Sequence, residues 1–146
     1  MGALQRLYLS SNELTGVPSS MGSLSNLTEL YLDNNQLTGA LPNSFIGLSH
    51  INEFYINDNN LTDLFDGFTN LTSIVSQHAN ISNNCLNVVG PAPLLYFLRD
   101  KDIPYAQKSC GNVSILLTTG ACMDVQPAVQ SECVALVDLY NSTNGD

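Results

Sequence analysis

Three tyrosines recur in this 146-residue chain at a spacing that could build a binding surface. Tyr8, Tyr31 and Tyr55 lie 23 and 24 residues apart. The residues two positions before and after them are charged or polar: Arg6, Glu29 and Glu53 before, and Ser10, Asp33 and Asn57 after. Tyrosine and arginine are enriched at interfaces, so we predict an aromatic column that binds a ligand between two polar columns. The alternative is that the tyrosines only support one another as a lateral ladder.

The sequence gives little support for catalytic activity. The sequence has no Gly-rich phosphate loop, no Gly-x-Ser-x-Gly and no His-Glu-x-x-His motif. We interpret His50 and His78, which stand alone, as surface or turn residues. Glu29 and Glu53 could form a carboxylate pair, but an open strand face lacks the desolvation that tunes such a pair for acid–base work. We therefore expect no enzyme activity and no cofactor.

The four cysteines could bind metal or form disulfides. They are Cys85, Cys110, Cys122 and Cys133. No Cys-x-x-Cys pair and no cluster of histidines accompanies them, so a metal site is not expected. Two disulfides in an oxidising compartment are the better interpretation, and three connectivities are open.

The charge balance limits the partners. Thirteen acidic and four basic residues give a net charge of −9, which argues against nucleic acid and anionic membranes. No stretch approaches the ~20 apolar residues of a membrane-spanning helix, so no direct membrane insertion is expected. The first residues lack the basic segment and apolar run of a signal peptide.

A repeated pattern positions the tyrosines. Leu-x-x-Leu-x-Leu-x-x-Asn-x-Leu begins at Leu4 and at Leu27, and a variant with isoleucine and phenylalanine begins at Ile51. A degenerate fourth unit ends at Leu86. Apolar and polar residues alternate at the start of each unit, which predicts a half-buried strand. The expected strands centre on Leu7–Leu9, Leu30–Leu32 and Phe54–Ile56, with a weaker one at Ala79–Ile81.

The repeated leucine, isoleucine and asparagine positions of this pattern have structural roles. Its leucines and isoleucines should form the core, because one coil cannot bury its own apolar edge and neighbouring coils must stack. The asparagines should satisfy backbone groups where the chain turns out of each strand. They are Asn12, Asn35, Asn59 and Asn84. Stacking would bring the tyrosines to about 4.8 Å from one another.

The segments between the strands resemble the plant-type leucine-rich-repeat (LRR) family. Leu37-Thr38-Gly39-Ala40-Leu41-Pro42 carries the resemblance, and Leu14-Thr15-Gly16-Val17-Pro18 matches it with one residue fewer. The third unit, 61–65, lacks both the glycine and the proline. The resemblance implies an α/β repeat solenoid with a short parallel sheet on its concave face, and with 3-10 or irregular returns.

Both ends of the remaining sequence resemble caps of LRR proteins. The segment around Cys85, a helix expected after Pro91, and Cys110 resemble a C-terminal cap, which implies a Cys85–Cys110 disulfide. Residues 122–146 resemble the N-terminal cap of a following array, which implies a Cys122–Cys133 disulfide. The expected organisation is repeats at 1–86, a C-terminal cap at 87–110, a junction at 111–121 and the second cap at 122–146, with small helices in the caps.

The resemblance also implies a function. We expect an extracellular or cell-surface recognition module that binds a protein, peptide or glycan on its concave face. The alternatives are a structural surface protein built from serial arrays, and an ectodomain piece of an LRR receptor kinase. Six Asn-x-Ser/Thr sequons are candidate glycosylation sites, although the repeat pattern itself readily generates Asn-Leu-Thr. They begin at Asn26, Asn60, Asn70, Asn80, Asn112 and Asn141.

Overall fold

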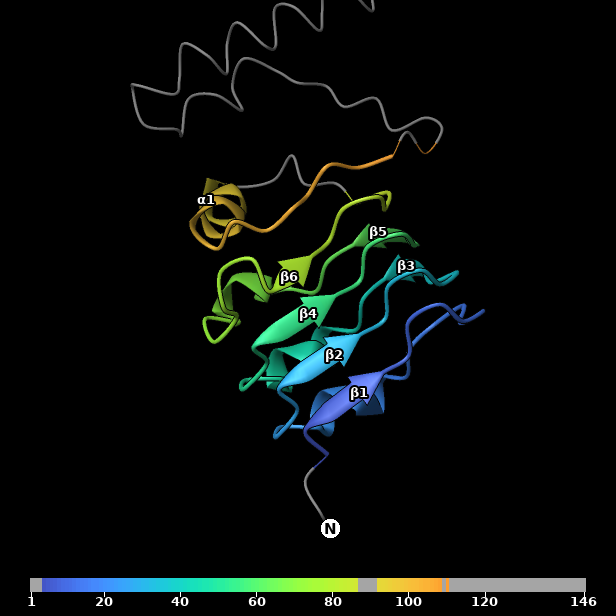
Figure 1. Cartoon of the computed structure of the whole chain (residues 1–146), viewed down its shortest axis with the longest axis horizontal. Coiled ribbons are helices and arrows are strands. Elements are labelled where there is room, and N and C mark those ends of the chain that lie inside the picture. The colour runs from blue at the N-terminus through green and yellow to red at the C-terminus, as the bar shows by residue number, and fades with distance from the viewer. Residues whose placement is uncertain (1–3, 87–91, 109, 111–146) are drawn as a thin grey trace, which may run out of the picture.

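Four coils stack along one axis in the computed structural model, which describes residues 4–86, 92–108 and 110 (Figure 1). Each coil contributes one short strand to a parallel sheet. Its strands, in spatial order, are β1 (Arg6–Tyr8), β2 (Glu29–Tyr31), β4 (Glu53–Tyr55) and β6 (Ala79–Asn80). The leucine-rich-repeat pattern therefore folds as a solenoid with in-register parallel strands.

The first three strands lie about one residue earlier than the sequence suggested, whereas β6 begins at Ala79 as expected and ends one residue earlier. A turn explains this, because one polar residue in each coil has a positive φ three residues after the strand. Ser11, Asn34, Asp58 and Asn83 adopt φ values of 56°, 54°, 56° and 53°. Short polar side chains tolerate this left-handed conformation better than β-branched ones do. The chain therefore leaves the sheet at the same point in every coil.

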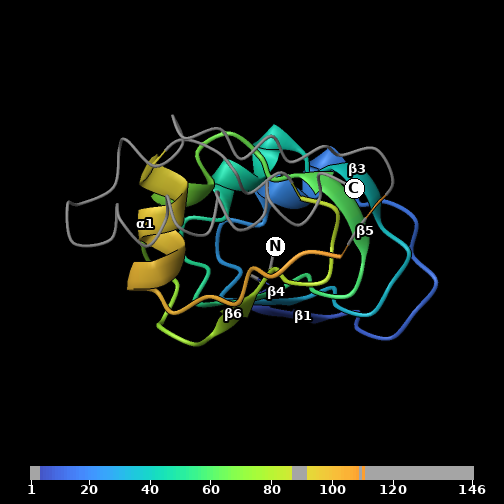
Figure 2. The same cartoon turned by 90° about the horizontal axis from the view of Figure 1, so that it is seen from above.

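The return segments lie on the side of the solenoid opposite the sheet (Figure 2). Three 3-10 helices form there: η1 (Ser19–Ser23), η2 (Asn43–Gly47) and η3 (Phe68–Asn70). Two glycines let η1 and η2 approach closely. A Cβ on Gly22 would lie 2.1 Å from the Ser44 carbonyl oxygen, and one on Gly47 would lie 2.4 Å from the Gly22 carbonyl oxygen.

A second, two-stranded sheet joins the two central coils. β3 (Thr38–Ala40) pairs in parallel with β5 (Asn60–Asp63). The third unit thus forms the return strand although it lacks the glycine and proline of the family pattern. Its backbone pairs with β3 and with the residue before it, since Asn60 N–H donates to the Leu37 carbonyl at 2.8 Å.

The core contains the apolar positions of the pattern. Leu30, Phe54 and Ala79, which are register partners, are each at most 1% exposed. The first coil differs, because Leu7 and Leu9 are only half-buried. The expectation that every leucine of the pattern lies in the core is therefore wrong for this coil. Only one neighbouring coil packs against it within the described residues.

The buried asparagines connect each coil to the one before it. Asn59 donates from Nδ2 to Leu32 O at 2.9 Å in the preceding coil, and its Oδ1 accepts from Leu37 N–H at 2.9 Å. Asn35 and Asn84 repeat both contacts. The predicted structural role is confirmed for these three residues. The fourth, Asn12, is exposed and bonds only within its own coil.

A fifth rung, which the sequence did not indicate, continues this network beyond β6. Ile81 N–H donates to Pro104 O at 3.1 Å, as Ile56 N–H does to Asn80 O at 3.0 Å. Gln107 then takes the place of a ladder asparagine. Its Oε1 accepts from Leu86 N–H at 3.2 Å, and its Nε2 donates to Ile81 O at 3.2 Å. The hydrogen-bond ladder therefore ends on a glutamine.

One helix and one disulfide cover the end of the core. The helix α1 (Ala92–Asp100) follows Pro91 as expected and buries Leu98, while Phe97 packs against Phe68 with ring centroids 5.7 Å apart. Cys85 and Cys110 form the expected disulfide. The predicted junction 111–121, the second cap 122–146 and the Cys122–Cys133 pairing lie outside the described residues.

Candidate ligand-binding face

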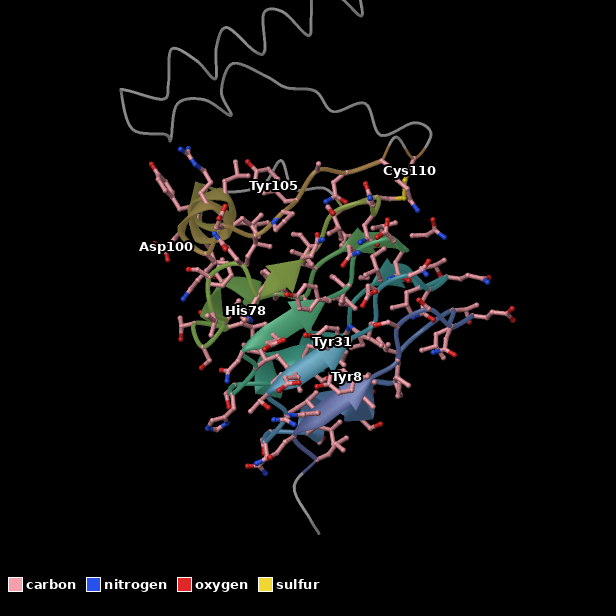
Figure 3. The ribbon with its side chains drawn as sticks, in the orientation of Figure 1. Tyr8, Tyr31, His78, Asp100, Tyr105 and Cys110 are labelled. Atoms are coloured by element: carbon pink, nitrogen blue, oxygen red, sulfur yellow. A yellow bond between two sulfur atoms is a disulfide. The ribbon has the colours of Figure 1, made fainter. Side chains whose placement is uncertain are left out.

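The tyrosines form a continuous column on the outward face of the β1-β2-β4-β6 sheet, which we call the tyrosine face. Tyr8, Tyr31 and Tyr55 are register partners in neighbouring strands. The ring centroids of Tyr8 and Tyr31 are 5.0 Å apart in an edge-to-face arrangement, and those of Tyr31 and Tyr55 are 4.7 Å apart and stacked. Figure 3 shows Tyr8 and Tyr31 on adjacent strands. The structure brings the predicted aromatic column together.

The three rings are not equally accessible. Tyr8 is 58% exposed, whereas Tyr31 and Tyr55 are half-buried. Tyr31 lies between its two neighbours and loses little orientational freedom when it binds something. Aromatic groups held in this way contribute contact area at low entropic cost. The centre of the column is therefore pre-organised.

Each of the first two tyrosines also bonds to a carboxylate of the next coil. Tyr8 Oη donates to Glu29, and Tyr31 Oη donates to Glu53. The bond to Glu29 raises the pKa of the Tyr8 phenol, and the bond to Glu53, with burial, raises the pKa of Tyr31 well above its ordinary value. Burial raises the pKa of Tyr55. All three phenols therefore remain protonated at neutral pH.

A second column runs beside the tyrosines and carries most of the charge. Arg6 Nε lies 2.9 Å from Glu29 Oε1, and His78 Nδ1 lies 3.3 Å from Glu53 Oε1. The hydrogen bond from Tyr31 lowers the pKa of Glu53, and the contact with His78 lowers it further, against an opposing effect of desolvation. Glu29 and Glu53 are neighbours in register, yet each has its own partners. They do not form an isolated acid–base pair.

His78 is exposed, as expected of a surface or turn residue, and it also contacts the charged column of this face. It precedes β6, whose register with β4 places it opposite Glu53. Figure 3 labels His78. Counting back three positions from Ile81, as from Ile56 to Glu53, would have identified it. The 25-residue spacing of the degenerate unit hid that signal. His50 is also exposed, and its Nδ1 lies 2.8 Å from the Ser25 carbonyl oxygen.

The third predicted column is only partly connected. Ser10 donates to Asp33 at 2.5 Å across two coils. Asn57 instead donates to its own neighbour, Asp58, at 2.5 Å. These residues lie beyond the strand ends and are half-buried, apart from the exposed Asp58. They form the rim of the tyrosine face rather than its centre.

Sequons lie in several different environments. Asn26, Asn60 and Asn70 are exposed, and the Asn60 amide oxygen accepts from Lys108 Nζ at 2.6 Å. Asn80 is half-buried and pairs in register with Tyr55. Asn112 and Asn141 lie outside the described residues.

The described part of the chain has neither a cluster of metal-ligating side chains nor a helix that could cross a membrane. Among residues 4–86, 92–108 and 110, no three His, Cys, Asp or Glu side chains are placed to hold a metal ion. In the same residues, no helix has the length and apolar character needed to cross a bilayer.

Two models of leucine-rich-repeat families match overlapping parts of the chain. Family models described as "Leucine Rich repeats (2 copies)" and "Leucine rich repeat" match residues 3–45 and 25–78. A 42-residue stretch, 29% of the chain, is 52% identical to a probable LRR receptor-like serine/threonine-protein kinase of Arabidopsis thaliana. The match spans only 4% of that kinase's length.

A solved structure shares the fold. The crystal structure of the BIR3–SERK2 complex from Arabidopsis thaliana contains a chain that superposes with a TM-score of 0.57 at 28% sequence identity. The match covers 74% of this chain and 57% of that one.

Proposed function

Because the chain belongs to the plant-type leucine-rich-repeat family, we propose that it is an extracellular recognition module that binds a protein partner on its tyrosine face. The observation that carries the proposal is the pre-organised column of Tyr8, Tyr31 and Tyr55. Hot spots at interfaces are enriched in tyrosine and lie at the centre of the contact, shielded by neighbours. Tyr31 has this position.

The charge of the face specifies the chemistry of the partner. Three carboxylates, those of Glu29, Asp33 and Glu53, stand against the single guanidinium of Arg6. The whole chain carries a net charge of −9. Complementary potentials speed association and exclude like-charged partners. A partner segment with net positive charge therefore fits this face best.

The similarity to a receptor-like kinase and to a chain of the BIR3–SERK2 complex supports an extracellular location. It also favours the expectation that this chain is a piece of a receptor ectodomain. The absence of enzyme activity in the chain remains part of the proposal, because Glu29 and Glu53 are each engaged by other side chains and do not form an acid–base pair.

A second candidate function is purely architectural. The hydroxyl groups of Tyr8 and Tyr31 already donate to Glu29 and Glu53 within the protein. A ladder satisfied in this way can stabilise stacked coils without any ligand. The two functions differ in what the loss of one tyrosine would do.

The test uses peptide selection on the disulfide-bonded chain produced in a bacterial periplasm. Peptides selected from a random display library on the wild type should carry net positive charge. Tyr31→Ala should weaken their binding about 30-fold, which corresponds to a hot spot of about 2 kcal/mol. Glu13→Ala, at an exposed position away from the strands, is the matched control and should bind like the wild type.

Stability measurements complete this test. Leu30→Ala should lower the free energy of unfolding by about 2–5 kcal/mol, because Leu30 is fully buried. Tyr31→Ala should lower it much less. Selected peptides that bind Tyr31→Ala as tightly as the wild type would show that the column is an architectural ladder.

A further inference from the structure

One sequon lies within the tyrosine face itself. In the sequence Asn80-Ile81-Ser82, Asn80 is the register partner of Tyr55. Its neighbours Ala79 and Ile81 are at most 1% exposed, so the strand alternation directs the Asn80 side chain outward beside the tyrosines. The fourth coil thus places an asparagine where the other three have an aromatic ring.

The amide of Asn80 is free at the atom that carries N-linked glycans. Its Oδ1 accepts from Ser82 N–H at 3.0 Å. Its Nδ2 donates no hydrogen bond to residues 4–86, 92–108 or 110, so substitution there breaks no contact within them. Asn84 makes the contrast clear, since its Nδ2 donates to Ile56, Ile81 and Ser82.

We propose that Asn80 carries an N-linked glycan that closes the tyrosine column at its β6 end. The proposal rests on the extracellular location in the proposed function. The Asn80 Nδ2 forms a bond to the anomeric carbon of a lipid-diphosphate-linked oligosaccharide. The sugar–oxygen bond to the diphosphate breaks, and the proton lost by the amide is taken up with the leaving diphosphate.

The position of the glycan follows from the spacing of the strands. Adjacent strands are about 4.8 Å apart, so the first sugar begins one strand spacing from the Tyr55 ring. Tyr31 stacks on one side of that ring. The glycan covers the ring from the β6 side, and a protein partner then has access only to the first three coils.

Site occupancy is the first measurement. The chain is secreted from eukaryotic cells behind a cleavable signal, and glycosylated asparagines are identified by mass spectrometry after enzymatic deglycosylation in heavy-oxygen water. Asn80 and the exposed Asn26 should both be occupied. An unmodified Asn80 overturns the proposal, whatever the state of Asn26.

Protection of Tyr55 is the second measurement. The rate of nitration of Tyr55 by tetranitromethane should rise several-fold in Asn80→Gln and in Ser82→Ala, which removes the sequon but keeps the asparagine. Asn26→Gln removes the glycan at Asn26 and keeps the one at Asn80, so it should leave the nitration rate of Tyr55 unchanged. Equal rates in all four proteins would show that the glycan points away from the column and overturn the proposed closure.

The peptide selection that tests the proposed binding function uses the unglycosylated chain from bacteria. Its result is independent of the glycan, so the binding function and the glycan proposal can fail separately.

Discussion

The asparagine ladder gives the sharpest test of what holds the tyrosine face in register. Asn59 is 1% exposed and has no access to water. In Asn59→Ala, Leu37 N–H loses its partner, which costs about 1–3 kcal/mol for a buried donor. The carbonyls of Leu32, Ile56 and Asn57 share the two hydrogens of the Asn59 amide, and losing those two donors costs about 0.5–1.5 kcal/mol each. With partial relaxation, we expect the free energy of unfolding to fall by about 3–5 kcal/mol.

Asn12→Ala is the matched control, because Asn12 occupies the same slot but is exposed. Water replaces its two bonds to Leu9 and Ser10, so the loss should be below about 1 kcal/mol. Urea unfolding, monitored by circular dichroism, gives the free energy of unfolding of both variants. The two values are compared at the same slope of free energy against urea concentration. Equal losses in the two variants would refute the reasoning.

A third variant separates hydrogen bonding from packing. Asn59→Asp keeps the shape of the side chain but turns an oxygen toward the three carbonyls. It should be more destabilising than Asn59→Ala at neutral pH. The penalty should shrink as the pH falls, since protonation restores one donor and the folded-state pKa of such a carboxyl is raised.

Two further predictions concern the tyrosine face and the opposite side. The pKa of Glu53 is lowered, chiefly by the hydrogen bond from Tyr31, so its contribution to stability is present above its unfolded pKa and is lost as the pH falls through its folded pKa. Glu53→Gln should therefore reduce the drop in thermal midpoint between pH 7 and pH 3, and an unchanged drop would contradict this. Gly47→Ala should destabilise the protein by about 1–3 kcal/mol, because its Cβ would collide with the Gly22 carbonyl oxygen. Gly16→Ala, whose Cβ meets nothing within 4 Å, should be nearly neutral, and equal effects in thermal unfolding would argue against a steric cause.

The register of the sheet could be predicted from the sequence because one pattern specifies three things at once. The spacing of Leu30, Tyr31 and Asn35 identifies a core position, an outward position and a turn. Repetition at Phe54, Tyr55 and Asn59 then aligns the strands without any knowledge of their contacts. The aromatic column follows directly from this alignment.

What the sequence did not reveal depends on contacts between distant segments. Gln107 stands one position earlier than a ladder asparagine would, and its extra methylene lets the amide reach the same backbone groups. The pairing of His78 with Glu53 required the register of a coil whose spacing had changed. The half-burial of Leu7 depends on how many coils cover it, which the pattern within one coil does not encode.

Because of the asparagine ladder, every coil joins its neighbour through the same hydrogen bonds. Every buried asparagine serves the backbone of the coil before it, so a whole coil can be added or removed and the cut ends still match. A gain or loss of one unit in the gene would leave the hydrogen-bond chain closed on Gln107 at its end. If the unit is one of the first three, which carry Tyr8, Tyr31 and Tyr55, the same event would lengthen or shorten the tyrosine column by one ring. In such a protein, duplication of one coil can change the length of the binding surface. The hydrogen bonds between coils stay the same, so no other substitution is needed.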